Sequence, residues 1–204
     1  MIRARHLMAA FGAVVLAACS SAPMHYYTLI PAPENAQPHG AAPPASFQFE
    51  LLPVGIPAQD DVPQLVVRQG GQAVDLLNSE RWIAPLADEV RGALSVDLSR
   101  RLNAQDISSG LPLDGKPVLR IKVDLRRFDS SPGNYALIDA TWTIRELGSQ
   151  AVLTCSSRIN ENAGQGYAGL VAGHQQALAT LAGQIASVAP AMAMGSVPSA
   201  CPAP

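Results

Sequence analysis

Two long segments of the chain alternate apolar and polar residues, and this alternation constrains the fold more than any other feature. Residues 118–125 (VLRIKVDL) alternate strictly, and Ala136, Ile138, Ala140, Trp142 and Ile144 repeat the pattern after a Ser-Pro-Gly-Asn turn. A period of two places all apolar side chains on one face of a strand. The segments therefore predict an antiparallel pair whose apolar face another layer must cover. Arg126-Arg127-Phe128 breaks the alternation, which indicates a bulge or the end of the strand. Leu153, Cys155 and Ile159 predict a third strand.

Two further segments have helical periodicity and can supply the covering layer. The first begins at Pro85, has Asp88 and Glu89 in its early turns, and carries a stripe of Leu86, Val90, Leu94, Leu98 and Leu102. The second begins near Tyr167 and carries an apolar face of Leu170, Val171, Leu178, Leu181, Ile185 and Val188. The chain is 48% hydrophobic and 15% charged, a composition that favours a packed core.

Shorter strands are predicted nearer the N-terminus. Residues 25–30 and 47–51 are rich in strand-forming types, and residues 64–68 and 73–77 flank a Gly70-Gly71 turn. The order of strands, helix, three-strand meander and helix predicts an α+β fold: a two-layer domain with a mostly antiparallel sheet and two helices packed on one face. The opposite face is expected to carry the charged side chains.

The N-terminus has the features of a bacterial lipoprotein precursor. Arg3 and Arg5 precede the uncharged segment 7–18, whose twelve residues are too few to span a bilayer, which needs about 20. We interpret residues 1–18 as a signal peptide that is removed. The sequence Leu16-Ala17-Ala18-Cys19 resembles a lipobox, so Cys19 is the expected lipid-attachment residue. An aspartate directly after the lipidated cysteine commonly signals retention in the inner membrane. This chain has Ser20 at that position, which favours sorting to the outer membrane.

Acylation at Cys19 would hold the protein stably on a membrane, since one acyl chain is marginal and three are not. Residues 19–24 would form a lipidated tether and residues 25–188 the domain, with a Pro/Ala-rich insertion at 31–46 and a low-complexity tail at 189–204. The five residues between Cys19 and the first strand span at most about 18 Å, so the domain would lie close to the membrane.

The other two cysteines, Cys155 and Cys201, could form a disulfide in a compartment that permits one. Such a bond would attach the tail to the sheet. The alternative is that Cys155 is a buried thiol that packs as a small apolar residue.

Motifs that would indicate catalysis are weak. Gly164-Gln165-Gly166-Tyr167-Ala168-Gly169 matches GxGxxG, but no acidic residue follows Glu161, so we interpret its glycines as a flexible helix start. His174 lies on the apolar face of the second helix, where a hydrogen-bonded core residue is the simpler interpretation than a catalyst. We find no Ser/His/Asp set and predict no enzymatic activity.

Charge and residue usage exclude other function classes. The net charge of −2 and the aromatic content of 5% argue against nucleic-acid binding. Arg120, Lys122, Arg126 and Arg127 could form a basic patch for lipid headgroups or an acidic partner; the alternative is a hydrated sheet face balanced by Asp124 and Asp139. No Cys/His cluster predicts a metal, and we expect no cofactor other than the covalent lipid on Cys19.

Several segments together resemble a known family. They are Tyr26-Tyr27-Thr28-Leu29, the residues 81–86 (RWIAPL), Leu98-Ser99-Arg100-Arg101-Leu102, Arg127-Phe128-Asp129 followed by Gly133, Ala140-Thr141-Trp142, and the residues 174–178 (HQQAL). Their order after a lipobox is similar to that of the ABC-type transport auxiliary lipoproteins of the paraquat-inducible protein C type.

This resemblance implies an outer-membrane lipoprotein that faces the periplasm and docks the lipid-transport tube built by an MCE-domain partner of the paraquat-inducible protein B type. Such a protein supports membrane integrity without catalytic residues, and family members can form rings of identical subunits. Two alternatives remain at this point. One is a lipoprotein activator or assembly factor for a peptidoglycan or outer-membrane machine; the other is a lipid hydrolase.

Overall fold

The computed structural model describes residues 23–32, 43–112 and 115–203. The predicted signal peptide, Cys19 and Ser20 lie outside these ranges. The elements run in the order β1 (His25–Tyr27), β2 (Gln48–Leu51), β3 (Gln64–Gly70), β4 (Ala73–Trp82), α2 (Leu86–Leu102), β5 (Val118–Ser131), β6 (Tyr135–Glu146), β7 (Val152–Asn162) and α3 (Gly166–Ala193). None of the helices in these ranges is long and apolar enough to cross a bilayer.

The larger sheet contains the predicted meander. Its order is β2-β5-β6-β7, antiparallel except for β2, which pairs parallel to β5. Val123 pairs with Trp142, and Trp142 pairs with Cys155, so the apolar positions of three strands share one face. The register shifts between Leu125 and Arg127, which confirms a bulge, and β5 then continues to Ser131.

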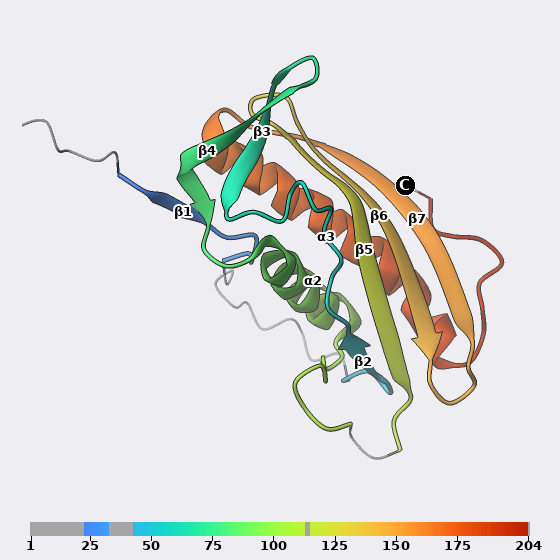
Figure 1. The fold of residues 1–204 in the computed structure, drawn as a ribbon. Helices are drawn as coiled ribbons and strands as arrows, with labels where there is room; N and C mark the ends of the chain where they lie inside the picture. The colour runs from blue at the N-terminus through green and yellow to red at the C-terminus, as the bar shows by residue number, and fades with distance from the viewer. Residues whose placement is uncertain (1–22, 33–42, 113–114, 204) are drawn as a thin grey trace, which may run out of the picture.

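Both helices cover the apolar face of this sheet (Figure 1), which confirms the predicted α+β class. All five residues of the predicted α2 stripe are buried: Leu86, Val90, Leu94, Leu98 and Leu102. Burying one leucine contributes roughly 1.5–3 kcal/mol, so this stripe is a major source of stability for the two layers. The other face of the sheet carries ion pairs, including Arg120 with Glu50 and Lys122 with Asp124.

The remaining strands form a second sheet of three strands in the order β1-β4-β3, instead of extending the first. The predicted hairpin around Gly70-Gly71 is present as β3 and β4, and β4 is five residues longer than expected. β1 pairs parallel to β4, with Tyr27 opposite Trp82. In Figure 1 the turn end of this hairpin extends past the helices.

The last helix is longer than the sequence analysis predicted. α3 continues past Val188 to Ala193, with Pro190 inside it. Ala189 and Met192 are fully buried against the core. The apolar contacts of this last turn therefore outweigh the single backbone hydrogen bond that a proline removes.

A candidate docking groove beside the β3–β4 hairpin

The two faces of the β3–β4 hairpin have different surroundings. Leu65 and Val67 point inward and are buried, whereas the opposite face carries Val66, Arg68, Val74 and Leu76. Val66 pairs with Leu76, and Arg68 pairs with Val74, so these four side chains lie together. Val74 is 48% exposed and Leu76 is 51% exposed. Folded proteins rarely leave several neighbouring apolar side chains of a strand exposed to solvent, so this face is a candidate interaction surface.

This open face forms one wall of a groove of about 210 Å³, and the end of β5 forms the other. The groove is lined by Gln59, Asp60, Val66, Val67, Arg68, Val74, Leu76, Arg127, Phe128, Asp129 and Ser130. We refer to it as the hairpin groove. The bulge at Leu125/Arg127 changes the register of β5 just before the residues that line the groove.

A three-residue ion pair network lies in the hairpin groove. Asp129 accepts hydrogen bonds from Arg68 Nε at 2.7 Å and from Arg127 Nη2 at 2.6 Å. Burial raises the pKa of the Asp129 carboxyl, but the two guanidinium groups outweigh burial and hold this pKa below its ordinary value. Asp129 therefore stays ionised and holds both arginines against the groove wall.

A second carboxyl group in the groove behaves in the opposite way. Asp60 is 7% exposed, and burial followed by the nearby charge of Asp129 raises its pKa to about 6, with Arg68 partly opposing the increase. The groove thus combines an exposed apolar wall with charges that largely balance each other. Such a surface suits a protein segment with both apolar and polar side chains.

His174 lies behind the groove wall and not in the groove. The side chain is fully buried, its ring stacks on Phe128 with centroids 3.9 Å apart, and its Nε2 atom hydrogen-bonds with Ser130 Oγ at 2.8 Å. Burial lowers the pKa of His174 to about 3, although the charge of Asp129 raises it slightly. The imidazole is therefore neutral at ordinary pH and packs as a core residue.

The Ser130–His174 pair does not make a hydrolase site. In a catalytic triad an acid holds the second ring nitrogen of the histidine, but Nδ1 of His174 has no hydrogen-bond partner. A histidine with this depressed pKa is also a poor general base near neutral pH. Ser130 itself is only 5% exposed. The arrangement supports the core interpretation of His174 over a lipid hydrolase.

Residues 27–186 match the family model described as "ABC-type transport auxiliary lipoprotein component". The chain belongs to this family. The description gives the members of this family as auxiliary components of ABC-type transport systems.

Solved structures share the fold of this auxiliary lipoprotein. A crystal structure of an uncharacterized protein is 18% identical, has a TM-score of 0.63, and covers 81% of this chain and 98% of its own. A DUF330 protein from Xanthomonas campestris is 16% identical, has a TM-score of 0.60, and covers 78% of this chain and 92% of its own. At these low sequence identities, the structural similarity establishes a shared fold and nothing about function. No curated protein matches the sequence.

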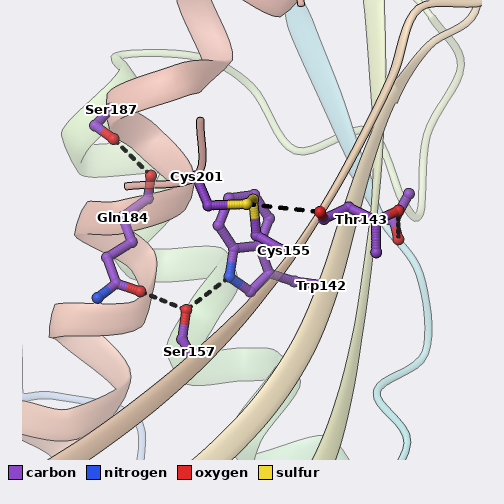
Figure 2. The surroundings of a disulfide bond; sticks show 8 residues. Trp142, Thr143, Cys155, Ser157, Gln184, Ser187 and Cys201 are labelled. Atoms are coloured by element: carbon purple, nitrogen blue, oxygen red, sulfur yellow. Dashed lines mark hydrogen bonds between the residues drawn. A yellow bond between two sulfur atoms is a disulfide. The ribbon is translucent and has the colours of Figure 1, made fainter. Parts of the chain in front are cut away.

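Cys155 and Cys201 of the auxiliary lipoprotein are joined by a disulfide, with their Cα atoms 5.7 Å apart (Figure 2). The bond holds the C-terminal residues beside β7 and α3. Next to it, Trp142 Nε1 donates a hydrogen bond to Ser157 Oγ at 2.8 Å, and Ser157 donates to Gln184 of α3. Sheet, helix and tail are therefore connected at one place.

The GxGxxG glycines of the auxiliary lipoprotein have a structural reason. A Cβ atom on Gly169 would lie 2.4 Å from the carbonyl carbon of Gly164, so the first turn of α3 packs directly on the preceding backbone. Gly166 has a φ of +70°, which favours glycine. The glycines therefore allow the first turn of α3 to pack closely against the backbone that precedes it.

Three of the four basic residues named from the sequence are paired with carboxylates. Arg120 pairs with Glu50 and Lys122 with Asp124, while Arg127 lies in the hairpin groove with Asp129. Asp139 lies 4.0 Å from Arg158. These pairs support the balanced, hydrated face. Among the residues described, no group of three or more His, Cys, Asp or Glu side chains could hold a metal.

Proposed function

We propose that this lipoprotein is anchored by acylated Cys19 to the periplasmic face of the outer membrane, where it docks an MCE-domain protein of a lipid-transport system. The observation that carries the proposal is the family match over residues 27–186, combined with the lipobox at Cys19. On this account the protein tethers the end of the transport tube and supports membrane integrity, with no catalytic step of its own.

The hairpin groove is the proposed docking surface. Val74 and Leu76 offer exposed apolar area, and the Arg68–Asp129–Arg127 network holds a rigid polar rim beside them. Interfaces commonly combine an apolar centre with such a rim. A ring of identical copies around the partner is part of the same proposal, since it would repeat the groove around the tube.

An activator of a cell-wall enzyme is the alternative function. Such a protein needs a long arm to reach through the peptidoglycan. In this chain the Pro/Ala-rich insertion at 31–46 follows β1, and β1 is built into the small sheet by pairing with β4. The insertion therefore adds no length between the anchor and the folded domain, which favours the docking role.

Crosslinking in living cells, followed by capture from detergent-solubilised membranes and mass spectrometry, tests the proposal. We expect an MCE-domain protein as the main partner of the wild type. The variant Leu76→Asp should lose this partner, because it places a charge on the apolar groove wall. Leu111→Asp is the matched control, since Leu111 is 87% exposed and lies outside the groove. Equal capture by both variants would exclude the groove as the docking surface.

A further inference from the structure

The outer face of β1 and the end of β4 carries a second set of exposed apolar side chains. Tyr26 pairs with Arg81, and Tyr27 pairs with Trp82, so Tyr26 and Arg81 project from one face of these parallel strands, and Ile83 follows directly after β4. Tyr26 is 58% exposed and Ile83 is 68% exposed. Met24, just before β1, is 41% exposed. We call Met24, Tyr26, Arg81 and Ile83 the N-terminal patch.

The opposite face of the same strands is held by polar contacts within the protein. Glu80 accepts a hydrogen bond from the Tyr27 hydroxyl at 2.7 Å and lies 2.9 Å from His25 Nδ1. Trp82 is buried and contacts Phe128 edge-on. Of the two faces, the one with the N-terminal patch therefore carries the exposed apolar side chains, whereas the opposite face is occupied by polar contacts and the buried Trp82.

The segment after β1 is fixed to α2, so β1 cannot swing away from the domain. Glu89 is 2% exposed and accepts hydrogen bonds from Thr28 Oγ1 and from the Leu29 amide, both at 2.7 Å. The Ile83 amide donates to the Tyr27 carbonyl at 2.9 Å. An anchor attached just before β1 would thus constrain the orientation of the whole domain.

From these observations we infer that the N-terminal patch inserts into the headgroup region of the lipid bilayer that holds the anchor. This inference rests on the proposed acylation of Cys19. Five residues separate Cys19 from β1, and they span at most about 18 Å, so the patch lies within a short distance of the lipid surface. A bilayer is therefore the surface nearest to it.

The side chains of the N-terminal patch are of types that suit the headgroup region of a lipid bilayer. Tyrosine is enriched where membrane meets water, because its ring is apolar and its hydroxyl is polar. Arg81 lies opposite Tyr26, and although its Nε donates to the Asn78 carbonyl at 3.3 Å, its terminal guanidinium nitrogens can contact lipid phosphates. Beside Ile83 lies a largely apolar hollow of about 370 Å³, whose lining includes Val62, Pro63 and Ala84 together with the carboxylate of Asp61. The hollow extends the apolar area toward the start of α2.

Site-specific labelling of the acylated protein tests this inference. A fluorophore is attached through Ile83→Cys, and the acylated protein is reconstituted in vesicles of phosphatidylethanolamine and phosphatidylglycerol. The matched control is Leu111→Cys, which is also exposed and apolar but follows the far end of α2, roughly 25 Å along the helix from Ile83. Wild type carried through the same labelling reaction reports any reaction of the native cysteines. Tyr26→Cys provides a second label on the patch should Ile83→Cys fold poorly.

We expect the label at position 83 to be quenched several-fold more by nitroxide-bearing lipids than the label at position 111, and to be shielded from aqueous iodide. Equal iodide quenching at the two positions would overturn the inference. Shielding from iodide without quenching by nitroxide lipids would also overturn it, because protein and not lipid would then cover the patch. Mass spectrometry of Cys19 separates the two proposals: an unmodified Cys19 contradicts the anchor itself, whereas an acylated protein with a water-exposed label contradicts only the patch.

Discussion

Protonation of His174 should be a main reason that this protein loses stability in acid. The folded protein holds His174 neutral, with a pKa lowered to about 3 by burial, whereas the ordinary pKa of histidine is 6.5. Below pH 6.5 the unfolded chain therefore binds a proton that the folded protein excludes. The stability from this group is fully present above that pH and decreases as the pH falls.

The size of the effect follows from the two pKa values. With 6.5 in the unfolded chain and about 3 in the folded protein, a change from pH 7 to pH 5 costs about 2 kcal/mol of unfolding free energy. Asp60 and Asp129 contribute pH dependences of their own. The difference between the wild type and His174→Gln isolates the histidine, because glutamine can still hydrogen-bond with Ser130 and does not titrate.

Urea unfolding of the chain from residue 20 onward at pH 7 and pH 5 measures this difference. We expect the wild type to lose about 2 kcal/mol relative to His174→Gln between the two conditions. Ser130→Ala is the control: it removes the 2.8 Å hydrogen bond but retains His174, so its pH dependence should stay close to that of the wild type. A difference between wild type and His174→Gln that does not change with pH would refute the buried, neutral histidine.

Three further predictions follow from the anchor, the tail and the groove. Cys19→Ala should leave a protein that a high-salt wash releases from membranes, and retention on the membrane after that wash would count against the anchor. Intact-mass measurement after alkylation should find the thiols of Cys155 and Cys201 only after reduction, and reduction should cost up to about 4 kcal/mol of stability, because the bond closes a loop with a sequence separation of 46. Asp60→Asn should stabilise the protein by up to about 3 kcal/mol above pH 6 and by little below pH 4, because a pKa raised to about 6 means that the folded state disfavours the charged carboxylate; an equal effect at both pH values would contradict this.

The elements with strong periodicity could be predicted from the sequence alone. The alternation along residues 118–125 and 136–144 predicted β5 and β6, and the leucine stripe predicted α2, because both patterns come from burial of one face. The split into two sheets could not be predicted. It depends on parallel pairing of β1 with β4 and of β2 with β5, between segments more than 50 residues apart, and such pairing has no local signature.

The hairpin groove was missed for a related reason. Arg127-Phe128-Asp129 could be identified as a break in the strand pattern, and Val74 as part of a short strand, but nothing local indicated that β3 would pack beside the end of β5. The second half of β4 contains Asn78 and Ser79, residue types that are common in turns, so the continuation of the strand to Trp82 has no clear signal in the sequence. Val74 and Leu76 fall within the predicted strand 73–77, and their exposure depends on how the hairpin packs in the assembled fold.

If an MCE-domain protein docks in the hairpin groove, as we propose, a photo-crosslinking amino acid at position 76 should capture that protein in living cells. We expect mass spectrometry to identify an MCE-domain protein in the crosslinked adduct, and we expect no such adduct from the same amino acid at position 111. An adduct at position 76 with a peptidoglycan synthase or an outer-membrane assembly factor, and no MCE-domain protein, would show that the groove binds a different partner and would refute the proposed docking role.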